Sequence, residues 1–316
     1  MRGKKILRVV FFTERGKFLA KKLQKTASNL ILENKPEDMS LGAWTQECFE
    51  NRLPILFIGS TGIAVRTIAP YVADKMSDSA VIVVDELGKN VIPILSGHFG
   101  GANEWAVKIA EDIDSNPVIT TATDINNVFA VDVFARKNGL RITDKSLIKR
   151  ISSKALKGQE LEVIEAVDKI EIDGLKLVPK RIVLGIGCKQ DKSFEELLDF
   201  VHEYYSDDEL EDDLYAIASI DVKADEIGLI RLAQYYGVPF FVYTAKELEA
   251  VEGDFTESDF VKEQVGVGNV CERAALLAAG DNGILVKDKI AKDGMTLAIA
   301  KRVELNIGEL WQDIFT

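Results

Sequence analysis

Cysteine, histidine and long apolar runs are all scarce in this sequence of 316 residues. Its three cysteines, Cys48, Cys188 and Cys271, lie far apart, which argues against a disulfide framework and against a CxxC metal site. The two histidines, His98 and His202, are too few for a multi-histidine metal site. No apolar run approaches the roughly 20 residues that span a bilayer, and the first apolar stretch is too short for a signal peptide. We therefore expect a cytoplasmic protein that does not bind a membrane.

Basic residues are in the minority, because 39 lysines and arginines face 51 aspartates and glutamates, which gives a net charge of −12. A nonspecific nucleic-acid binder replaces counterions with a surplus of lysine and arginine, so this balance argues against a nucleic-acid partner. Catalysis is expected to rest mostly on carboxylates, lysines, hydroxyls and one histidine. Hydrophobic residues nevertheless make up 47% of the chain, as in a globular protein with a sizeable core.

Apolar runs of strand length alternate with helically spaced ones, and many of the joining turns contain glycine. This order is typical of an α/β fold with mainly parallel sheets. It occurs twice, which predicts two α/β domains, an N-terminal one over 1–135 and a C-terminal one over 181–316. Between them, residues 136–180 are rich in charge and have helically spaced apolar positions, so we expect a small, mostly helical middle segment. We also expect a short strand at 118–121 and a solvated loop at the acidic stretch 207–213.

The first glycine-rich turn, at 59–66, follows a strongly apolar strand and opens a helix. Ligands of open parallel sheets bind at the carboxyl ends of strands, and backbone N–H groups at a helix N-terminus suit an anion. Arg66 lies one turn into the helix, where it can reach the same anion. The alternative is a tight turn with a hydroxyl as the helix cap. The residues that we assign to substrate binding here are Gly59, Ser60, Thr61, Gly62 and Arg66.

The second glycine-rich turn, at 96–103, has three glycines in six positions, which indicates positive φ angles or a close approach of the backbone to a partner. His98 lies among them and is the best general acid or base by residue type. The alternative is a histidine that bonds a nearby carbonyl. The substrate-binding candidates of this turn are Ser96, Gly97, Gly100, Gly101 and Asn103.

Carboxylates and hydroxyls follow two further strands. Asp85 and Glu86 end a strand, where burial can raise the pKa of a carboxyl and make it a base; the alternative is turn chemistry before Gly88. Thr121, Thr123 and Asp124 belong to a hydroxyl-rich segment that either binds a polar ligand or caps a helix. We expect the loops 59–66, 85–89, 96–103 and 120–124 to line one cleft, with loops of the second domain closing over it.

The C-terminal domain repeats the pattern of a strand followed by a glycine turn. Gly187 and Lys189 follow one strand, but a lone GxG lacks the third glycine of a dinucleotide fingerprint. Ser219, Lys223 and Glu226 follow the next strand, without the SxxK or GxSxG spacing of known nucleophiles. We assign the first four to substrate binding and Glu226 to the candidate bases.

Taken together, these loops resemble the CbiG family of cobalamin-synthesis proteins. The resemblance covers nearly all of 5–302, although the middle segment looks short for the family. Seven separate motifs carry it in the expected order: 59–70, 83–86, 93–103 and 120–124 in the first domain, and 185–189, 219–226 and 265–272 in the second.

The resemblance implies the hydrolysis of cobalt-precorrin-5A in anaerobic cobalamin biosynthesis. Water opens the δ-lactone of this tetrapyrrole, acetaldehyde leaves as a carbon–carbon bond breaks, and the product is cobalt-precorrin-5B. No cofactor or protein-bound metal is implied, because the cobalt belongs to the substrate. His98, Glu86, Asp85 and Glu226 are the candidate catalytic groups, with His98 preferred as the base, and Arg66, Lys189 and Lys223 offer partners for substrate carboxylates.

Two other classes of function stay open. A non-catalytic protein that binds or carries a corrinoid intermediate would have the same loops but would release no acetaldehyde. A sugar-phosphate or nucleotide enzyme would need a phosphate loop, yet the sequence lacks GxxxxGK[ST] and a complete GxGxxG. The sequence also leaves open two further kinds of partner: a second copy of the chain in a homodimer, and neighbouring pathway enzymes in transient contacts.

Overall fold

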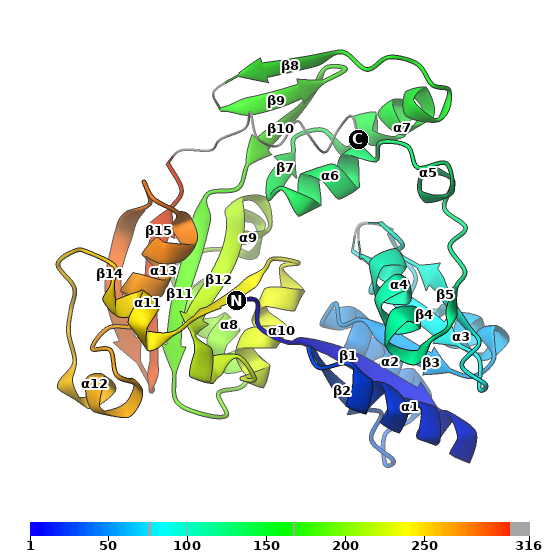
Figure 1. Ribbon diagram of the computed structural model, residues 1–316, viewed down its shortest axis with the longest axis horizontal. Coiled ribbons are helices and arrows are strands. Elements are labelled where there is room, and N and C mark those ends of the chain that lie inside the picture. Colours follow the sequence, from blue (N-terminus) through cyan, green and yellow to red (C-terminus); the bar gives the residue numbers. More distant parts are fainter. Residues whose placement is uncertain (75–76, 99, 167, 304–316) are drawn as a thin grey trace. The chain divides into compact units, whose positions relative to one another are not determined.

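The computed structural model describes residues 1–74, 77–98, 100–166 and 168–303. These residues form two compact units, which are taken one at a time below (Figure 1). The N-terminal unit consists of Lys5–Val133 and Ser152–Gln159. The C-terminal unit consists of Met1–Lys4, Phe134–Ile151 and the chain from Glu160 onward. Among the described residues, no helix has the length and apolar character that a membrane crossing requires.

The N-terminal unit is built on a six-stranded sheet with the order β2-β1-β3-β4-β5-β6. Neighbouring strands run parallel except for β4 and β5, which are antiparallel. Both faces are covered, so β3 and β4 are continuous buried apolar runs. The strands are β1 (Lys5–Phe11), β2 (Leu30–Asn34), β3 (Ile55–Ile58), β4 (Val81–Val84), β5 (Asn90–Leu95) and β6 (Asn116–Pro117).

Helices cover this sheet on both faces, and alternate residues of each strand serve the two cores. Leu7 and Val9 of β1 face α1 and α4, whereas Val10 faces α2 and α3 around Trp44. The helices are α1 (Glu14–Thr26), α2 (Leu41–Glu50), α3 (Thr61–Ile68), α4 (Ala102–Ile113) and the short α5 (Ala122–Ile125). The result is a three-layer sandwich, which confirms the α/β fold with a mainly parallel sheet that the sequence predicts for this domain.

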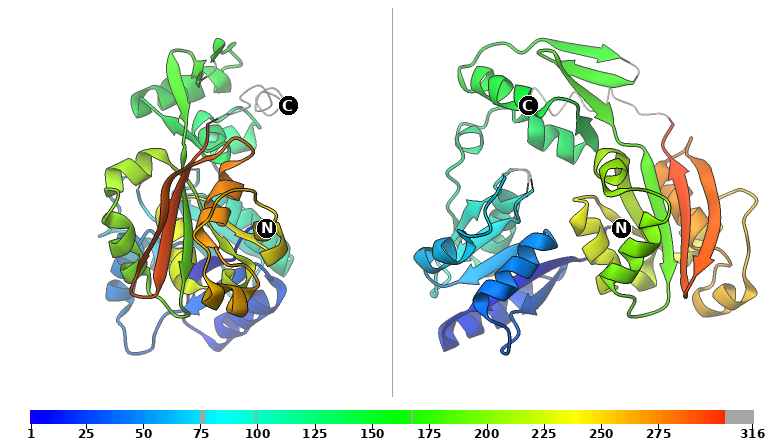
Figure 2. Two further views of the ribbon diagram at one scale, coloured as in Figure 1. Left: turned by 90° about the vertical axis from the view of Figure 1, so that its left-hand side faces the viewer. Right: turned by 180° about the vertical axis from the view of Figure 1, so that it is seen from behind.

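The C-terminal unit has a five-stranded sheet with the order β13-β12-β11-β15-β14, whose first three strands are parallel. Figure 2 shows this sheet edge-on, with α8 and α13 on opposite sides. The strands are β11 (Ile182–Cys188), β12 (Leu214–Ile220), β13 (Phe240–Tyr243), β14 (Ile284–Lys292) and β15 (Met295–Lys301). The helices are α8 (Phe194–His202), α9 (Asp207–Asp213), η2 (Asp221–Lys223), α10 (Ile227–Tyr235), α11 (Ala245–Glu249), α12 (Asp259–Val265) and α13 (Cys271–Ala279).

The start of the chain belongs to this second sheet. Met1 and Val242 exchange backbone hydrogen bonds of 2.8 and 2.9 Å, and Arg2 forms an antiparallel bridge with Phe241. These bonds cover the exposed edge of β13, because an edge strand otherwise leaves its N–H and C=O groups unpaired. Met1 and Arg2 therefore extend the same sheet that contains β14 and β15.

The middle segment differs from the expectation of a mostly helical region. It contains a four-stranded antiparallel sheet with the order β7-β10-β9-β8, beside η1 (Lys145–Leu147), α7 (Ile148–Leu156) and the end of α6 (Val131–Lys137). Buried residues alternate with more exposed ones in β9 and β10, which is the strand period and not the helical one. The strands are β7 (Leu140–Ile142), β8 (Val163–Ala166), β9 (Lys169–Ile172) and β10 (Leu175–Pro179).

Two smaller expectations are also wrong. The acidic stretch is the helix α9, because Ser206 and Glu209 form a capping box and acidic groups stabilise a helix N-terminus. Its Leu210 is fully buried, which fixes the helix on the unit. The short strand is β6 at Asn116–Pro117, and the residues that follow it, 118–121, are not a strand.

Candidate functional site

The loops predicted to line a single cleft in the N-terminal domain lie at two opposite edges of the sheet. Each edge here means the row of loops at one end of the strands. Because β5 runs antiparallel to β4, its carboxyl end lies beside the amino end of β4, where Leu95 pairs with Val81. The loops 59–66 and 85–89 therefore lie at one edge, and 96–103 and 120–124 lie at the other. The length of β4, about 13 Å for four residues at 3.3 Å each, separates the two edges.

A signal for this reversal is present in the sequence. Only five residues, 85–89, connect β4 to β5. A parallel connection needs a crossover of a dozen or more residues, so a connection this short can join only antiparallel strands. The prediction of one cleft overlooked that limit.

At the first edge, Asp85 closes the β4–β5 turn. Its carboxylate accepts hydrogen bonds from the backbone N–H groups of Leu87 (2.9 Å), Lys89 (3.3 Å) and Asn90 (2.7 Å). Burial opposes ionisation, but these N–H groups outweigh it and lower the pKa of Asp85. A carboxylate with a lowered pKa is a weak base, so the turn explains Asp85 better than catalysis does. Glu86 lies beside it, partly buried.

The turn 59–62 at the same edge leads directly into α3. Ser60 is the N-cap residue, but its side chain makes no capping hydrogen bond. The exposed Arg66 folds back toward the first turn of the helix, because its Nη1 lies 3.4 Å from the position that a Cβ on Gly62 would occupy. Gly59, Gly62 and Thr61 thus surround a helix start with a guanidinium close to it.

The second edge brings together the histidine and a set of polar side chains. The Nε2 atom of His98 lies 2.8 Å from Oδ2 of Asp124 and 3.1 Å from Oγ1 of Thr123. The Nδ2 of Asn103 donates to the same Oδ2 atom and to Oγ1 of Thr121, both at 2.8 Å. Four of the residues assigned from the sequence therefore meet His98 in one hydrogen-bonded cluster.

The glycines of the 96–103 loop make room for this cluster. A Cβ on Gly97 would lie 2.8 Å from Oδ1 of Asn103, and one on Gly100 would lie 2.6 Å from the Cβ of Ser96. Gly101 has a φ of 75° at the N-cap of α4, where a left-handed residue lets the chain turn into the helix. These positions carry glycine for steric reasons, so backbone contact with a substrate is not needed to explain them.

Asp132, at the start of α6, completes the cluster, and the sequence analysis missed it. Its Oδ2 lies 3.5 Å from Nδ1 of His98, so both ring nitrogens face carboxylates. The side chains of His98 and Asp132 are 17% and 12% exposed, whereas that of Asp124 is 39% exposed. No motif links Asp132 to the loop; only the fold brings it there.

The charges of the cluster reinforce one another. The hydrogen bond to Asp132 raises the pKa of His98, burial opposes this, and Asp124 adds to the increase. Burial would raise the pKa of Asp132, but the bond with His98 outweighs it and lowers that pKa. The arrangement therefore favours an imidazolium between two carboxylates. A ring that is held in its charged form can donate a proton, and His98 as the general base stays a prediction of the sequence analysis.

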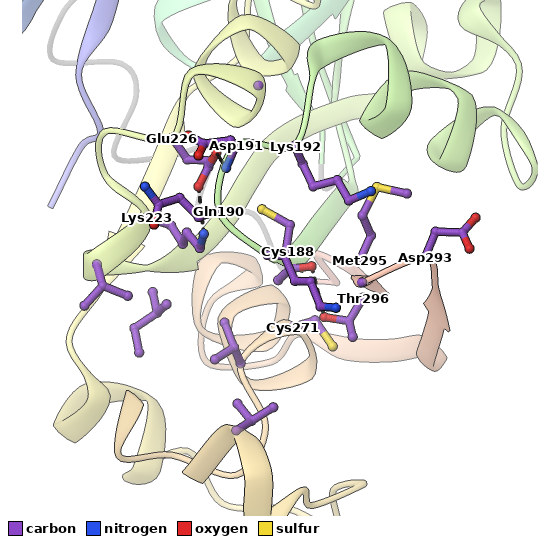
Figure 3. A pocket seen from close by; sticks show the side chains of 18 of the residues that line it. Cys188, Gln190, Asp191, Lys192, Lys223, Glu226, Cys271, Asp293, Met295 and Thr296 are labelled. Carbon is purple, nitrogen blue, oxygen red and sulfur yellow. Dashed lines mark hydrogen bonds and ion pairs between the residues drawn. The ribbon is translucent and has the colours of Figure 1, made fainter. Parts of the chain in front are cut away.

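The C-terminal unit contains a cavity of about 1,220 Å³ at the carboxyl ends of β11 and β12 (Figure 3). Gly187, Lys189, Lys223 and Glu226 all line it, as their positions after these strands predict. Ser219 is instead buried and donates a 2.6 Å hydrogen bond to the carbonyl of Ile186, so it joins two strands.

Glu226 holds the loop that forms one wall of the cavity. It is 8% exposed, and its Oε1 accepts the backbone N–H of Asp191 at 2.8 Å. Its Oε2 accepts a 2.7 Å bond from Nζ of Lys223 (Figure 3). Both oxygens are engaged, which argues for a positioning role over a base.

The cavity also contains two cysteines, Cys188 and Cys271 (Figure 3). Burial raises the pKa of each thiol to about 11. Both are therefore protonated near neutral pH and are poor nucleophiles. Within the described part of the chain, no group of three or more histidine, cysteine or acidic side chains could hold a metal ion.

Comparison with known proteins relates both regions to cobalamin synthesis. The family model described as Cobalamin synthesis G N-terminal matches residues 43–124, and that described as Cobalamin synthesis G C-terminus matches 182–300. The first includes His98 and Asp124 but stops before Asp132, and the second includes the lining of the cavity.

Several individual proteins are similar as well. A cobalt-precorrin-5A hydrolase of Salmonella typhimurium is 34% identical over 304 residues, which cover 84% of this chain and 86% of that protein. A cobalt-precorrin-5A hydrolase of Priestia megaterium is 28% identical, covering 80% and 79%. Protein CobE of a Sinorhizobium species is 33% identical over 38% of this chain and 79% of its own. The crystal structure of a putative cobalamin biosynthesis protein G homolog from Sulfolobus solfataricus is 23% identical, covers 96% of this chain and 98% of its own, and has a TM-score of 0.40.

Proposed function

The chain belongs to the CbiG family of cobalamin-synthesis proteins, and we propose that it acts as a cobalt-precorrin-5A hydrolase. The reaction adds water to the substrate and yields cobalt-precorrin-5B and acetaldehyde. The 34% identity to a hydrolase of this name, over most of both chains, supports the assignment. The proposal needs one partner, the tetrapyrrole, and no protein-bound cofactor, because cobalt arrives in the substrate. It suits a cytoplasmic protein and needs neither a homodimer nor transient contacts with neighbouring pathway enzymes.

The observation that carries the chemistry is the environment of Asp124. Its Oδ2 atom accepts both from His98 and from Asn103, at 2.8 Å each. The side chain is still 39% exposed, so the other oxygen is available to a water molecule. We therefore assign the general base to Asp124 and keep His98 as its protonated partner, which orients it and supplies a proton. Positioned proton transfer of this kind contributes roughly 10²–10⁴ in rate.

The proposed steps balance in atoms and electrons. Asp124 removes a proton from water as the oxygen bonds to the lactone carbonyl carbon. The tetrahedral intermediate then breaks its bond to the ring oxygen, which leaves an alkoxide and a carboxylic acid, and the acid loses its proton to solvent. The alkoxide becomes the carbonyl group of acetaldehyde as the carbon–carbon bond breaks. The electron pair of that bond enters the conjugated macrocycle, which takes up a proton.

The other candidate bases fit less well. Asp85 closes a turn, Glu226 has both oxygens engaged, and Glu86 lies at the sheet edge opposite His98. Substrate carboxylates have cationic partners in Arg66, at that opposite edge, and in Lys189 and Lys223, in the cavity of the C-terminal unit.

Incubation with cobalt-precorrin-5A tests the proposal directly. The purified chain should release one acetaldehyde per substrate, measured by reduction with alcohol dehydrogenase and NADH, and mass spectrometry should find cobalt-precorrin-5B. A corrinoid that binds without releasing acetaldehyde would instead identify a binding or carrier protein.

A further inference from the structure

The lining of the cavity in the C-terminal unit includes three large apolar side chains that are exposed. Phe260 of α12, Val222 and Ile227 line it and are 68%, 65% and 37% exposed. Single exposed apolar residues are common, but three that converge on one cavity indicate a surface that a ligand covers. Phe260 is the only aromatic ring of the three, and it can stack on a flat conjugated ligand.

The size and charge of the cavity restrict that ligand further. Its volume of about 1,220 Å³ exceeds the roughly 300–1,000 Å³ of pockets for drug-sized molecules. Six of its described lining residues are basic and five are acidic, whereas the chain as a whole carries −12. The lining is therefore close to balanced in charge, unlike the acidic chain as a whole, and it offers basic side chains to a ligand. A large, flat molecule with an apolar face and carboxylates at its rim has the complementary chemistry.

We propose that α12 is a substrate platform on which Phe260 stacks against the macrocycle of a cobalt corrinoid, while Lys189 binds one of its carboxylates. This proposal rests on the proposed function, because that function supplies a polycarboxylate tetrapyrrole as the ligand. It adds a recognition surface in the C-terminal unit and gives Phe260 the role of a specificity-determining residue.

The platform is held rigidly from α13 by a buried glutamate. Glu272 is 1% exposed, and it accepts the backbone N–H groups of Thr256 at 3.0 Å and Lys289 at 2.7 Å. The amide of Asn269 donates to it as well and also to the carbonyl of Thr256, at 3.0 Å. These bonds fix the chain on both sides of α12.

Arg273, the next residue of α13, fixes the approach to α12. Its Nη1 donates to the carbonyl of Val251 at 2.8 Å, and its Nη2 contacts Glu257 at 2.8 Å. Its guanidinium also lies 4.4 Å from the ring centroid of Phe255. Because the platform is already ordered, binding does not have to order it, and that saves conformational entropy.

Absorbance titration of the full chain with cobyrinic acid, a stable cobalt corrinoid with free carboxylates, tests the platform. Phe260→Ala should weaken binding about tenfold, and Phe260→Trp should restore it, because the indole ring still stacks. Phe18→Ala is the matched control, since Phe18 is also an exposed helical phenylalanine, 73% exposed, but lies in the N-terminal unit. A Kd of Phe260→Ala within twofold of the control would overturn the proposal.

A second ligand tests the carboxylate contact. Cobinamide keeps the corrin ring but carries amides in place of carboxylates. Lys189→Gln should therefore weaken the binding of cobyrinic acid about tenfold and leave the binding of cobinamide unchanged. An equal effect on both ligands, or on neither, would refute the role of Lys189.

Failure of this proposal can be told apart from failure of the proposed function. If the wild-type chain releases acetaldehyde and Phe260→Ala has unchanged KM and kcat, the platform is wrong and the hydrolase stands. If no acetaldehyde forms while the titrations behave as expected, the platform stands as a corrinoid site and the hydrolase assignment fails. The platform predicts a raised KM with an unchanged kcat for Phe260→Ala.

Discussion

His98 and Asp132 form a pair in which Nδ1 of the ring lies 3.5 Å from Oδ2 of the carboxylate. This pair changes the role expected for the histidine. With Asp124 at its other nitrogen, the ring is favoured in its charged form, and its pKa is raised, chiefly by the bond to Asp132. In the proposed mechanism the proton-accepting role therefore belongs to the more exposed Asp124.

Asp124→Asn should lower kcat by about 10²–10⁴, because the amide cannot accept the proton of water. The binding of cobyrinic acid should be unchanged. Asp114→Asn is a suitable control in the same unit, since Asp114 lies at the end of α4 with a φ of 58°, which asparagine tolerates. Full turnover by Asp124→Asn would remove Asp124 from the mechanism.

The rate of the wild-type enzyme should fall as the pH rises through the raised pKa of His98, above the ordinary value of about 6.5. The reason is that the proposed mechanism uses the protonated ring. The Asp132→Asn variant loses the largest cause of the raised pKa of His98, so the descending limb of its pH–rate profile should lie at lower pH. An ascending limb near pH 6.5 in the wild type would return the role of base to His98.

The same pair predicts how stability depends on pH. Because the folded-state pKa of His98 is raised, its stabilisation is fully present below the unfolded pKa of about 6.5 and is lost as the pH rises through the folded pKa. The difference in Tm between the wild type and His98→Gln should therefore shrink between pH 6 and pH 9. A constant difference across that range would contradict the pairing.

Asp85→Ala should destabilise the N-terminal unit by about 1–2 kcal/mol, because three backbone N–H groups of the β4–β5 turn lose their acceptor. The lowered pKa of Asp85 means that this stabilisation is present above the unfolded pKa and is lost as the pH falls through the folded one. Urea unfolding measures the effect, and kcat should stay unchanged. Glu86→Ala is the neighbouring control and should leave stability within about 0.5 kcal/mol. If Asp85→Ala abolished turnover in a fully folded protein, Asp85 would be a catalytic group after all.

Arg66→Ala should raise KM for cobalt-precorrin-5A about tenfold and leave kcat unchanged. A guanidinium can bind a substrate carboxylate, but Arg66 lies at the sheet edge opposite His98 and so cannot touch the groups around it. Steady-state kinetics separate the two constants. An unchanged KM would show that no substrate carboxylate reaches Arg66.

The sequence by itself determined most of the elements, because strands and helices follow from short-range patterns. The runs at β3 and β4 are continuous and apolar, as strands covered on both faces require. The apolar spacing over 102–113 and 271–279 predicts helices, and α4 and α13 have these bounds. The two glycine-rich motifs and the motifs that carry the family resemblance are also short segments, so the sequence alone is enough to identify them.

Tertiary structure alone decided which of these loops meet. The reversal of β5 put the His98 loop and the Arg66 loop at opposite edges of one sheet, and antiparallel pairing in the middle segment replaced the expected helices. Asp132 reaches His98 only because α6 follows α5 back toward the 96–103 loop, and no spacing in the sequence encodes that contact. Hydrogen bonds between distant segments depend on the path of the whole chain, whereas the patterns that predict strands and helices depend only on near neighbours.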